Sequence, residues 1–395
     1  MANVSLSEAK KAKNDEFYTQ YSDIEKEINA YLDYDPDVFK GKTVLLPCDD
    51  PEWSNFTKYF AQNFERFGLK KLISTSYAVE SKKYQANYQP TLFETEDPRF
   101  DVVKTKKNGK IFTLDHDTSG DGKIDVNDLE WDYLKGDGDF RSDEIKKLRD
   151  EADFIITNPP FSLFREYIAW LFETDKKFAT IGSLNAITYK EIFPLIKDNF
   201  MWLGNGFHAG NAYFETPFAK EYGDGVYNSE TGLVKFRNVS WFTNIDHGRR
   251  HRPLPLMTMA DNLKFSKHKE IKERGYPKYD NYEAIEVPFT DAIPSDYPGV
   301  MGVPISFLDK YSPEQFEILG ATQRGCHDLV PDTIKYDDYW EVKQDGTKTG
   351  SSGGKTNENA NLLENDGKKN YFINSEGRII QSCYQRIFIK HKDPK

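Results

Sequence analysis

Apolar and polar positions in the first half of the chain follow two alternating periods, which predict helices and strands in turn. Apolar residues at spacings of three and four predict helices at 21–32, 55–67, 143–151, 163–172 and 189–196. Short apolar runs predict strands at 43–46, 69–75, 154–157 and 177–182. Such alternation is typical of an α/β fold with a doubly wound sheet, in which ligands bind beyond the carboxyl ends of the strands.

The pattern changes near residue 205, where short aromatic strands between Gly, Pro and Asn turns replace the helix–strand alternation. We therefore expect a first domain at 14–205 and a second at 206–395. Polar composition predicts a flexible lysine-rich arm at 1–13, an irregular stretch at 81–111 and a flexible Gly/Ser/Asn-rich loop at 344–369. A last strand is predicted at 386–390.

Composition excludes several classes of protein. Aromatic residues make up 14% of the 395 residues, which argues against a disordered chain. No apolar stretch approaches the roughly 18–20 residues that span a bilayer, and no apolar segment follows the N-terminal lysines as in a secretory signal. The three cysteines have no metal-ligand spacing, which indicates a reducing compartment. A soluble cytoplasmic protein is expected.

The charge distribution leaves room for a nucleic-acid partner despite a net charge of -11. Residues 113–153 hold 14 acidic and 6 basic side chains, whereas 247–278 hold 9 Lys/Arg and 3 acidic side chains. One face can therefore be basic while the whole molecule is acidic. The alternative, that 247–278 is only a solvated loop, stays open at this point.

The strongest candidate for chemistry is the run Asn158-Pro159-Pro160-Phe161, which directly follows a predicted strand. An Asn amide and a proline-turn carbonyl would supply two hydrogen-bond acceptors for a planar NH2 group, and Phe161 a face for stacking. Holding both amino hydrogens frees the nitrogen lone pair for attack on a methyl donor. A base in a duplex would first have to be flipped out. The structural alternative is a Pro-Pro turn with Asn158 as helix cap.

A second motif, Phe17-Tyr18-Thr19, precedes the first predicted helix. It could line the same pocket at the methionine end of S-adenosylmethionine. It could equally be a hydrophobic staple with Thr19 as the helix cap.

Together these segments resemble the EcoRI-type adenine-specific DNA methyltransferases. The similar runs include KNDEFYTQYSDIEKEI, CDDPEWSNFTKYF, GDGDFRS, ITNPPFSLFREY, YPKYDNYEAI and GVMGVPISFLDKYSPEQFE, in one order from about residue 10 to 320. The resemblance implies a class I, Rossmann-like methyltransferase domain at 14–205, a DNA-recognition region at 206–395 and S-adenosylmethionine as donor. The implied reaction is N6 methylation of adenine in double-stranded DNA, with GAATTC as a candidate site.

The resemblance also implies roles for individual residues. Asn158 and the Pro159 carbonyl would accept the adenine amino hydrogens, Pro160 would complete the turn, and Phe161 would stack on the flipped base. The cofactor would contact Phe17, Tyr18, Thr19, Cys48, Asp49, Asp50, Pro51, Asp139 and Phe140. Two features depart from the wider methyltransferase pattern: the turn after the first strand lacks glycines, and Ser74–Tyr77 holds no carboxylate for a ribose.

Other functions remain open on the residues alone. Enzymes that methylate RNA bases or a protein glutamine amide share the Asn-Pro-Pro-aromatic run, and a catalytically inactive DNA- or calcium-binding protein is the non-enzymatic alternative. The resemblance suggests that a monomer can suffice. A separately encoded restriction endonuclease and an orphan modification role are both compatible with it.

The acidic stretch at 113–132 holds a loop with EF-hand-like spacing. Its candidate calcium ligands are Asp117, Ser119, Asp121, the Lys123 carbonyl, Asp125 and Asp128. A structural calcium ion bracing the neighbouring site wall is the functional interpretation. A solvated acidic hairpin is the alternative.

Candidate DNA contacts lie in the basic segment of the second half. Arg249, Arg250 and Arg252 could bind guanine edges or phosphates, and Lys267, Lys269 and Lys272 are typical backbone contacts.

Overall fold

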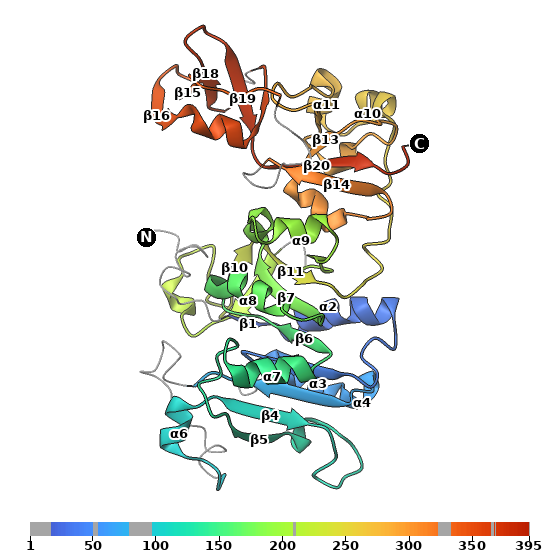
Figure 1. Ribbon diagram of the computed structural model, residues 1–395, viewed down its shortest axis with the longest axis vertical. Helices are drawn as coiled ribbons and strands as arrows, with labels where there is room; N and C mark the ends of the chain where they lie inside the picture. The colour runs from blue at the N-terminus through green and yellow to red at the C-terminus, as the bar shows by residue number, and fades with distance from the viewer. Residues whose placement is uncertain are drawn as a thin grey trace. The chain divides into compact units, whose positions relative to one another are not determined.

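The computed structural model describes residues 17–49, 54–78, 97–207, 211–322, 333–364, 367 and 369–394 (Figure 1). The chain divides into two compact units. The first contains residues up to 186 together with 201–248, and the second contains 187–200 together with 249–395. The strands of 202–243, which lie almost wholly beyond the predicted boundary at 205, thus belong to the first unit. The arm at 1–13 is outside the described residues.

The first unit is built on an eight-stranded sheet. Across the sheet the order is β5 (Glu130–Tyr133), β4 (Lys110–Leu114), β3 (Lys71–Thr75), β2 (Thr43–Leu46), β6 (Phe154–Thr157), β7 (Lys177–Ser183), β11 (Val239–Thr243) and β8 (Trp202–Leu203). The four central strands β3, β2, β6 and β7 are parallel, and the outer strands pair antiparallel. The protein is therefore mixed α/β with a mixed sheet. Within 81–111, β4 and α6 (Val102–Lys107) replace part of the irregular stretch that we predicted.

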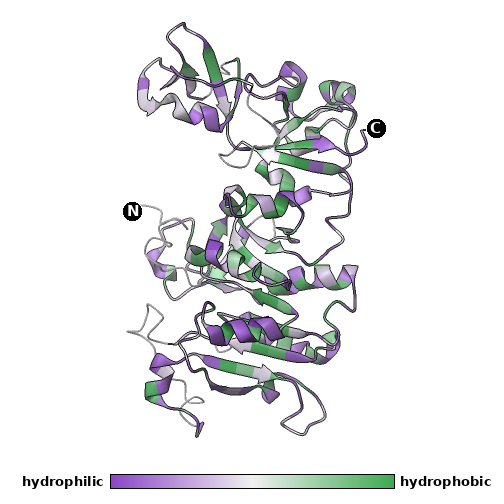
Figure 2. Ribbon diagram, in the orientation of Figure 1, coloured by the Kyte–Doolittle hydropathy of each residue, from purple (hydrophilic) through white to green (hydrophobic). Residues whose placement is uncertain are grey.

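Helices cover both faces of the parallel strands. Val44 and Leu46 pack in one apolar cluster with α2 (Tyr21–Tyr34), α3 (Asn55–Gln62) and α4 (Phe64–Phe67), whereas Leu45 packs with α7 (Asp143–Glu151) in another. Alternate residues of a strand point to opposite faces, so a fully apolar strand needs a helix layer on each side. Figure 2 shows the result, with apolar central strands beside a largely hydrophilic α7. The helix predicted at 163–172 forms as a 3-10 turn followed by α8 (Phe164–Leu171).

A small three-stranded sheet lies beside this core. It contains β1 (Tyr18–Thr19), β9 (Asn211–Glu215) and β10 (Val234–Arg237), all antiparallel. The Phe17 ring, 5% exposed, packs on Phe214 at 5.7 Å and edge-on to Phe236 at 5.0 Å between ring centroids. Aromatic burial therefore anchors a strand of only two residues.

Glu27 on α2 is fully buried beneath the chain segment that leads to β9. Its carboxylate accepts hydrogen bonds from the Tyr31 hydroxyl at 2.6 Å and from the backbone N–H groups of Asn205 and Gly206 at 3.0 and 3.1 Å. Burial raises the pKa of Glu27 from 4.5 to about 7, although these hydrogen bonds oppose the change.

We expect this carboxyl to make stability fall as pH rises from 4.5 to 7. In that range the folded state keeps the proton on Glu27 and the unfolded state has lost it, which disfavours folding. At about 1.4 kcal/mol per pH unit, the loss is on the order of 3 kcal/mol. Urea unfolding of Glu27→Gln at pH 5 and 7.5 should show the variant gaining about this much on the wild type. The same substitution at exposed Glu25 on α2 is the control, and an equal change in both variants would contradict the prediction.

The second unit holds two sheets. One has the order β12 (Ile285–Glu286), β13 (Met301–Pro304), β20 (Arg386–His391) and β14 (Phe316–Ala321). The other has the order β16 (Lys348–Ser352), β15 (Trp340–Val342), β18 (Tyr371–Ile373), β19 (Ile379–Cys383) and β17 (Ala360–Leu362). Helices α9 (Phe193–Lys197), α10 (Met259–Phe265) and α11 (Lys269–Arg274) belong to the same unit. Because β14 and β20 pair antiparallel, residues 322–385 are an insertion within a hairpin.

The stretch predicted as a flexible loop at 344–369 contains β16, β17 and a 3-10 helix at Gly353–Glu358. Gly346 lies in the bend between β15 and β16, whereas Gly350 lies within β16 and Asn361 within β17. The pairing partners of these strands lie in β15 and β19, which a local composition argument does not see.

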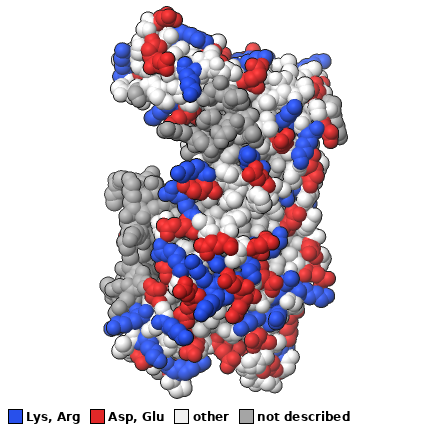
Figure 3. Space-filling model, in the orientation of Figure 1, with Lys and Arg blue, Asp and Glu red and all other residues white. Residues whose placement is uncertain are grey.

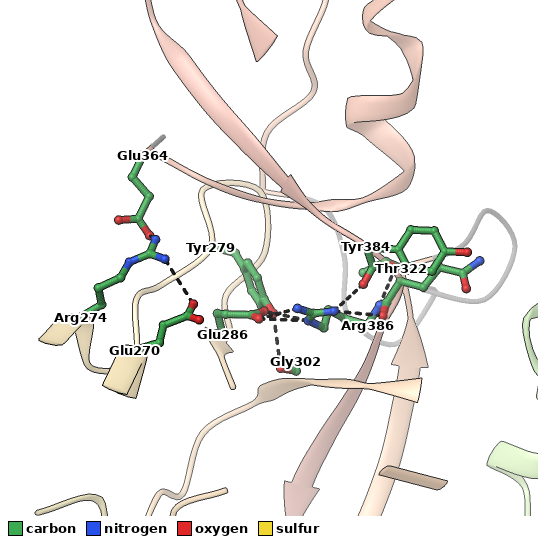
Figure 4. Close-up of polar contacts among 10 residues, drawn as sticks. Glu270, Arg274, Tyr279, Glu286, Gly302, Thr322, Glu364, Tyr384 and Arg386 are labelled. Carbon is green, nitrogen blue, oxygen red and sulfur yellow. Dashed lines mark hydrogen bonds and ion pairs between the residues drawn. The ribbon is translucent and has the colours of Figure 1, made fainter. Parts of the chain in front are cut away.

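A buried ion pair links β12 and β20 across the strand that lies between them. Arg386 on β20 donates from Nε and Nη2 to the Glu286 carboxylate, with Nη2 at 2.6 Å from Oε1, and the Tyr279 hydroxyl donates to the same carboxylate (Figure 4).

On the face drawn in Figure 3, acidic and basic side chains are intermixed rather than separated. Among the described residues, no helix is long and apolar enough to span a membrane.

Candidate active site

Asn158 lies at the carboxyl edge of the central parallel strands. The four residues of β6 are all buried, so the strand is fixed in the core and Asn158 emerges at its end. The Thr157 hydroxyl donates to the Pro47 carbonyl at 2.5 Å, which ties this edge to the turn after β2. The chain continues from β2 to β3 on one side and from β6 to β7 on the other, so the site is at the switch point where α/β sheets bind ligands.

The Asn158 side chain is oriented by β1. Its Nδ2 donates to the Phe17 carbonyl at 2.6 Å and is 3.4 Å from the Thr19 hydroxyl oxygen. Its Oδ1 is buried and accepts no hydrogen bond within the described part of the chain. An unsatisfied buried acceptor is costly, so it indicates a place where a ligand donor belongs.

The residue after Asn158 carries a second acceptor. Neither proline has an N–H group to offer. The Pro160 carbonyl accepts from the Leu163 N–H at 2.9 Å, whereas the Pro159 carbonyl accepts none among the residues described. Two acceptors, from Asn158 and Pro159, are thus available to a planar amino group.

The structure places Phe161 in the core rather than on an open face. The ring is 2% exposed and its centroid lies 5.5 Å from that of Phe17 and 6.2 Å from that of Phe214. Stacking on a ligand would require these aromatic contacts to open. The stacking role stays a prediction.

The predicted cofactor residues are brought together only in part. Phe17 and Thr19 contact the Asn158 side chain, and Tyr18 lies between them on β1; their role at the cofactor stays a prediction. Asp49 instead supports the first turn of α3, whose N-cap is Ser54. It is 3% exposed, and its carboxylate accepts from the Ser54 hydroxyl and from the Thr57 N–H and hydroxyl at 3.0 and 2.5 Å. Asp50 and Pro51 are outside the described residues.

The Cys48 side chain contacts Tyr77, a residue for which the sequence predicted no role. The backbone at Cys48 has φ +62°, a strained conformation for a residue with a side chain, and its Sγ donates to the Tyr77 hydroxyl at 3.4 Å. Burial raises the pKa of Tyr77 well above its usual value, and the neighbouring Cys48 adds to this. Tyr77 lies two residues after the end of β3, so its place just beyond the second predicted strand was the available signal.

Asp139 and Phe140 lie close to Tyr77. The Asp139 carboxylate pairs with Arg141 at 2.6 Å, and this pairing lowers its pKa. Phe140 is fully buried against Tyr167. Gly138 has φ +87°, and a Cβ there would lie 2.3 Å from the Ser76 carbonyl oxygen, so only glycine lets this turn approach the end of β3.

The acidic loop does not assemble the calcium ligands that we predicted. Asp117 accepts from the backbone N–H groups of Gly120 and Gly122, and Asp128, 2% exposed, accepts from those of Ser119 and Asp125. Within the described residues, which include all of 115–129, no three His, Cys, Asp or Glu side chains are grouped to hold a metal. The carboxylates, including those of Asp121 and Asp125, instead cap the loop between β4 and β5. This arrangement does not support the predicted calcium site.

The predicted DNA-contacting residues differ in their exposure. Arg250 is 6% exposed and donates to Asn199, so it lies in the core of the second unit and not on its surface. Arg249 is half-buried and pairs with Asp309 at 2.5 Å. Four cations are exposed, namely Arg252, Lys267, Lys269 and Lys272. Lys267 pairs with Asp291 and Lys269 with Glu273, and Lys272 forms no ion pair among the described residues.

Comparisons with known proteins agree on one family. A model of the family described as adenine-specific methyltransferase EcoRI matches residues 5–392. The chain is 44% identical to the type II methyltransferase M.EcoRI of Escherichia coli over 320 residues, 80% of this chain and 89% of the relative. It is 33% identical to the type II methyltransferase M.MpnI of Mycoplasma pneumoniae over 85% of this chain and 90% of the relative. No solved structure matches.

Proposed function

Because the chain belongs to the EcoRI family of adenine-specific methyltransferases, we propose that it methylates N6 of adenine at a short sequence in double-stranded DNA, with S-adenosylmethionine as donor. The observation that carries this proposal is the buried Asn158 Oδ1, which receives no hydrogen bond from the described residues; nor does the next carbonyl in the chain, that of Pro159. An exocyclic amino group has two hydrogens and fits these two acceptors.

The two acceptors would activate the adenine amino group. The lone pair of this nitrogen is delocalised into the ring. Holding both hydrogens out of the plane of the ring favours a pyramidal nitrogen, whose lone pair is free to attack the methyl group. S-adenosylmethionine supplies an electrophilic methyl group when bound. The protein needs no covalent intermediate, so Asn158 and Pro159 contribute orientation and electrostatics.

The cofactor would lie beyond the carboxyl ends of β2, β3 and β6, as in a class I methyltransferase fold. The described residues best placed to line it are Phe17–Thr19, Cys48, Tyr77 and Phe140. The ion pair with Arg141 holds the Asp139 carboxylate in a fixed position. The Asp49 carboxylate, committed to α3, would act on the cofactor only through the turn that it stabilises.

A target adenine must leave the duplex to reach Asn158, at a cost of a few kcal/mol for unpairing and unstacking. Phe161 would supply the stacking face after the Phe17 and Phe214 side chains rotate away from its ring, a movement that leaves the backbone carbonyl of Phe17 in place. The second unit would read the sequence, and a separately encoded endonuclease would make the enzyme the modification half of a restriction system.

The proposed function is tested by methyl transfer from labelled S-adenosylmethionine to unmethylated genomic DNA, with modified bases mapped by single-molecule sequencing. We expect N6-methyladenine within one short motif, of which GAATTC is the first to examine. Transfer to RNA but not to DNA would overturn the proposed substrate. Cytosine methylated at N4 would overturn the choice of base, and cytosine methylated at C5 would overturn the assignment of the pocket, because C5 carries no amino group.

Lys272 is the cation best placed to contact a DNA phosphate, since it is exposed on α11 without an acidic partner in the described residues. For Lys272→Ala we expect weaker DNA binding at 0.1 M salt and a salt slope of log K smaller by about 0.9, the value for one released counterion. Cofactor affinity should not change. Lys269→Ala should have a smaller effect because Glu273 already neutralises Lys269 in part. Equal effects on binding in both variants would contradict the assignment.

A further inference from the structure

Strand β1 has a property that contact with a cofactor would not require. The carbonyl of Phe17, the residue just before the strand, lies 2.6 Å from Asn158 Nδ2, closer than the Thr19 hydroxyl at 3.4 Å. A backbone carbonyl can only accept a hydrogen bond. The amide must therefore turn its NH2 group toward Phe17 and its Oδ1 away from it.

Three sets of contacts hold the backbone segment that carries the Phe17 carbonyl. Asn55, the first residue of α3, donates from Nδ2 to the Thr19 carbonyl at 2.8 Å. The strand pairs with β9, Tyr18 opposite Glu215 and Thr19 opposite Phe214. The buried Phe17 ring packs among aromatic rings of the core. Little motion of the carbonyl is thus available to follow a different side chain at position 158.

We propose that β1 is the positioning element of the methyl-transfer site: the Phe17 carbonyl, with Thr19 and Asn55 supporting it, selects the one Asn158 rotamer in which Oδ1 faces the target amino group. This proposal rests on the proposed function. It explains why Oδ1 has no partner among the residues that the structure describes, since the amide hydrogens fix the rotamer before substrate arrives. Preorganised acceptors avoid reorientation during the reaction.

A carboxylate in place of the Asn158 amide should meet the Phe17 carbonyl differently in its two protonation states. In Asn158→Asp, an ionised carboxylate would place an oxygen against the Phe17 carbonyl, and two acceptors repel. The protonated carboxyl would donate to Phe17 and keep its carbonyl oxygen for the amino group, so it mimics the amide. The pKa of the carboxyl introduced by this substitution should therefore be raised, and only its protonated form should be active.

We expect the single-turnover methylation rate of Asn158→Asp, divided by that of the wild type, to rise as pH falls from 9 to 6. The rise should approach about tenfold per pH unit above the pKa of the introduced carboxyl. Without the orienting carbonyl the opposite trend is expected, because an ionised carboxylate is the stronger acceptor for the amino group. A ratio that is constant or rises with pH overturns the proposal. A wild type that transfers no methyl group to adenine would instead overturn the proposed function.

A second measurement applies even if Asn158→Asp is inactive at every pH. Asn158→Asp should lose stability relative to Asn158→Ala as pH rises from 5 to 8, because the folded state resists ionisation of the introduced carboxyl. The measured quantity is the difference between their free energies of unfolding. A pH-independent difference would overturn the proposal.

Asn55 provides the test of the supporting contact. Asn55→Asp keeps the shape but loses the donor to Thr19, and we expect the single-turnover rate to fall about five- to tenfold with cofactor affinity unchanged. The matched control is Asn63→Asp, which removes a similar side-chain donor to the Tyr59 carbonyl at the other end of α3. Equal rates in the two variants, or parallel losses of cofactor affinity, would mean that Asn55 only stabilises the fold.

Discussion

Replacing Asn158 by Ala should lower methyl transfer to adenine by about 10²–10³-fold, the effect of removing one preorganised hydrogen-bonding group from a polar active site. The variant loses the buried Oδ1 that we assign to the amino group, and also the donor to the Phe17 carbonyl. The Pro159 carbonyl remains and supports a residual rate. Single-turnover rates with saturating cofactor and DNA measure the effect.

The control for this prediction is Asn127→Ala, an exposed amide in the acidic loop of the same unit. It should methylate at the wild-type rate. Cofactor affinity of Asn158→Ala should stay within a few-fold of wild type, because Asn158 acts on the amino group of the target base. A rate within tenfold of wild type at saturation would show that another group holds the adenine.

Breaking the buried Glu286–Arg386 pair should destabilise the protein by about 3–5 kcal/mol, since the remaining charge is left without a partner in the core. The Glu286 side chain is 6% exposed and that of Arg386 is 15% exposed, and the Tyr279 hydroxyl completes the network (Figure 4). The free energy of unfolding of Arg386→Met and of Glu286→Leu, measured in urea, tests each side.

The double variant Arg386→Met/Glu286→Leu should lose clearly less than the sum of the two single losses, because two apolar side chains leave no buried charge. Lys278→Met, which removes the exposed Lys278–Glu283 pair of the same unit, is the control and should cost less than about 1 kcal/mol. Single variants as stable as this control would mean that water reaches the Glu286–Arg386 pair.

Local patterns predicted much of the first unit correctly. The strand at 43–46 matches β2 in full, the strand at 154–157 matches β6, and the helix at 143–151 matches α7. These elements are short-range products of apolar periodicity and of caps such as Ser142, which accepts from the Ile145 N–H. The family could also be recognised, because its motifs are contiguous runs of residues.

Exposure of charged residues could not be predicted in the same way. Arg250 and Arg252 are two positions apart in one basic run, yet Arg250 is buried on Asn199 and Arg252 is exposed. The acidic loop had the spacing of calcium ligands, but its carboxylates accept backbone N–H groups instead. In both cases the deciding partner is set by how the backbone folds back, and spacing alone carries no such information.

The sequence by itself determined the helix–strand alternation of the first unit and the acceptor-rich turn at Asn158-Pro159, because strand burial and proline chemistry are local. Only the tertiary structure decided what faces that turn. The Phe17 carbonyl that orients Asn158 lies 141 positions earlier in the chain, and its strand is held by β9, nearly 200 positions later. Such contacts form because the apolar faces of distant segments bury one another, and the polar groups that they carry are then forced to find partners at close range.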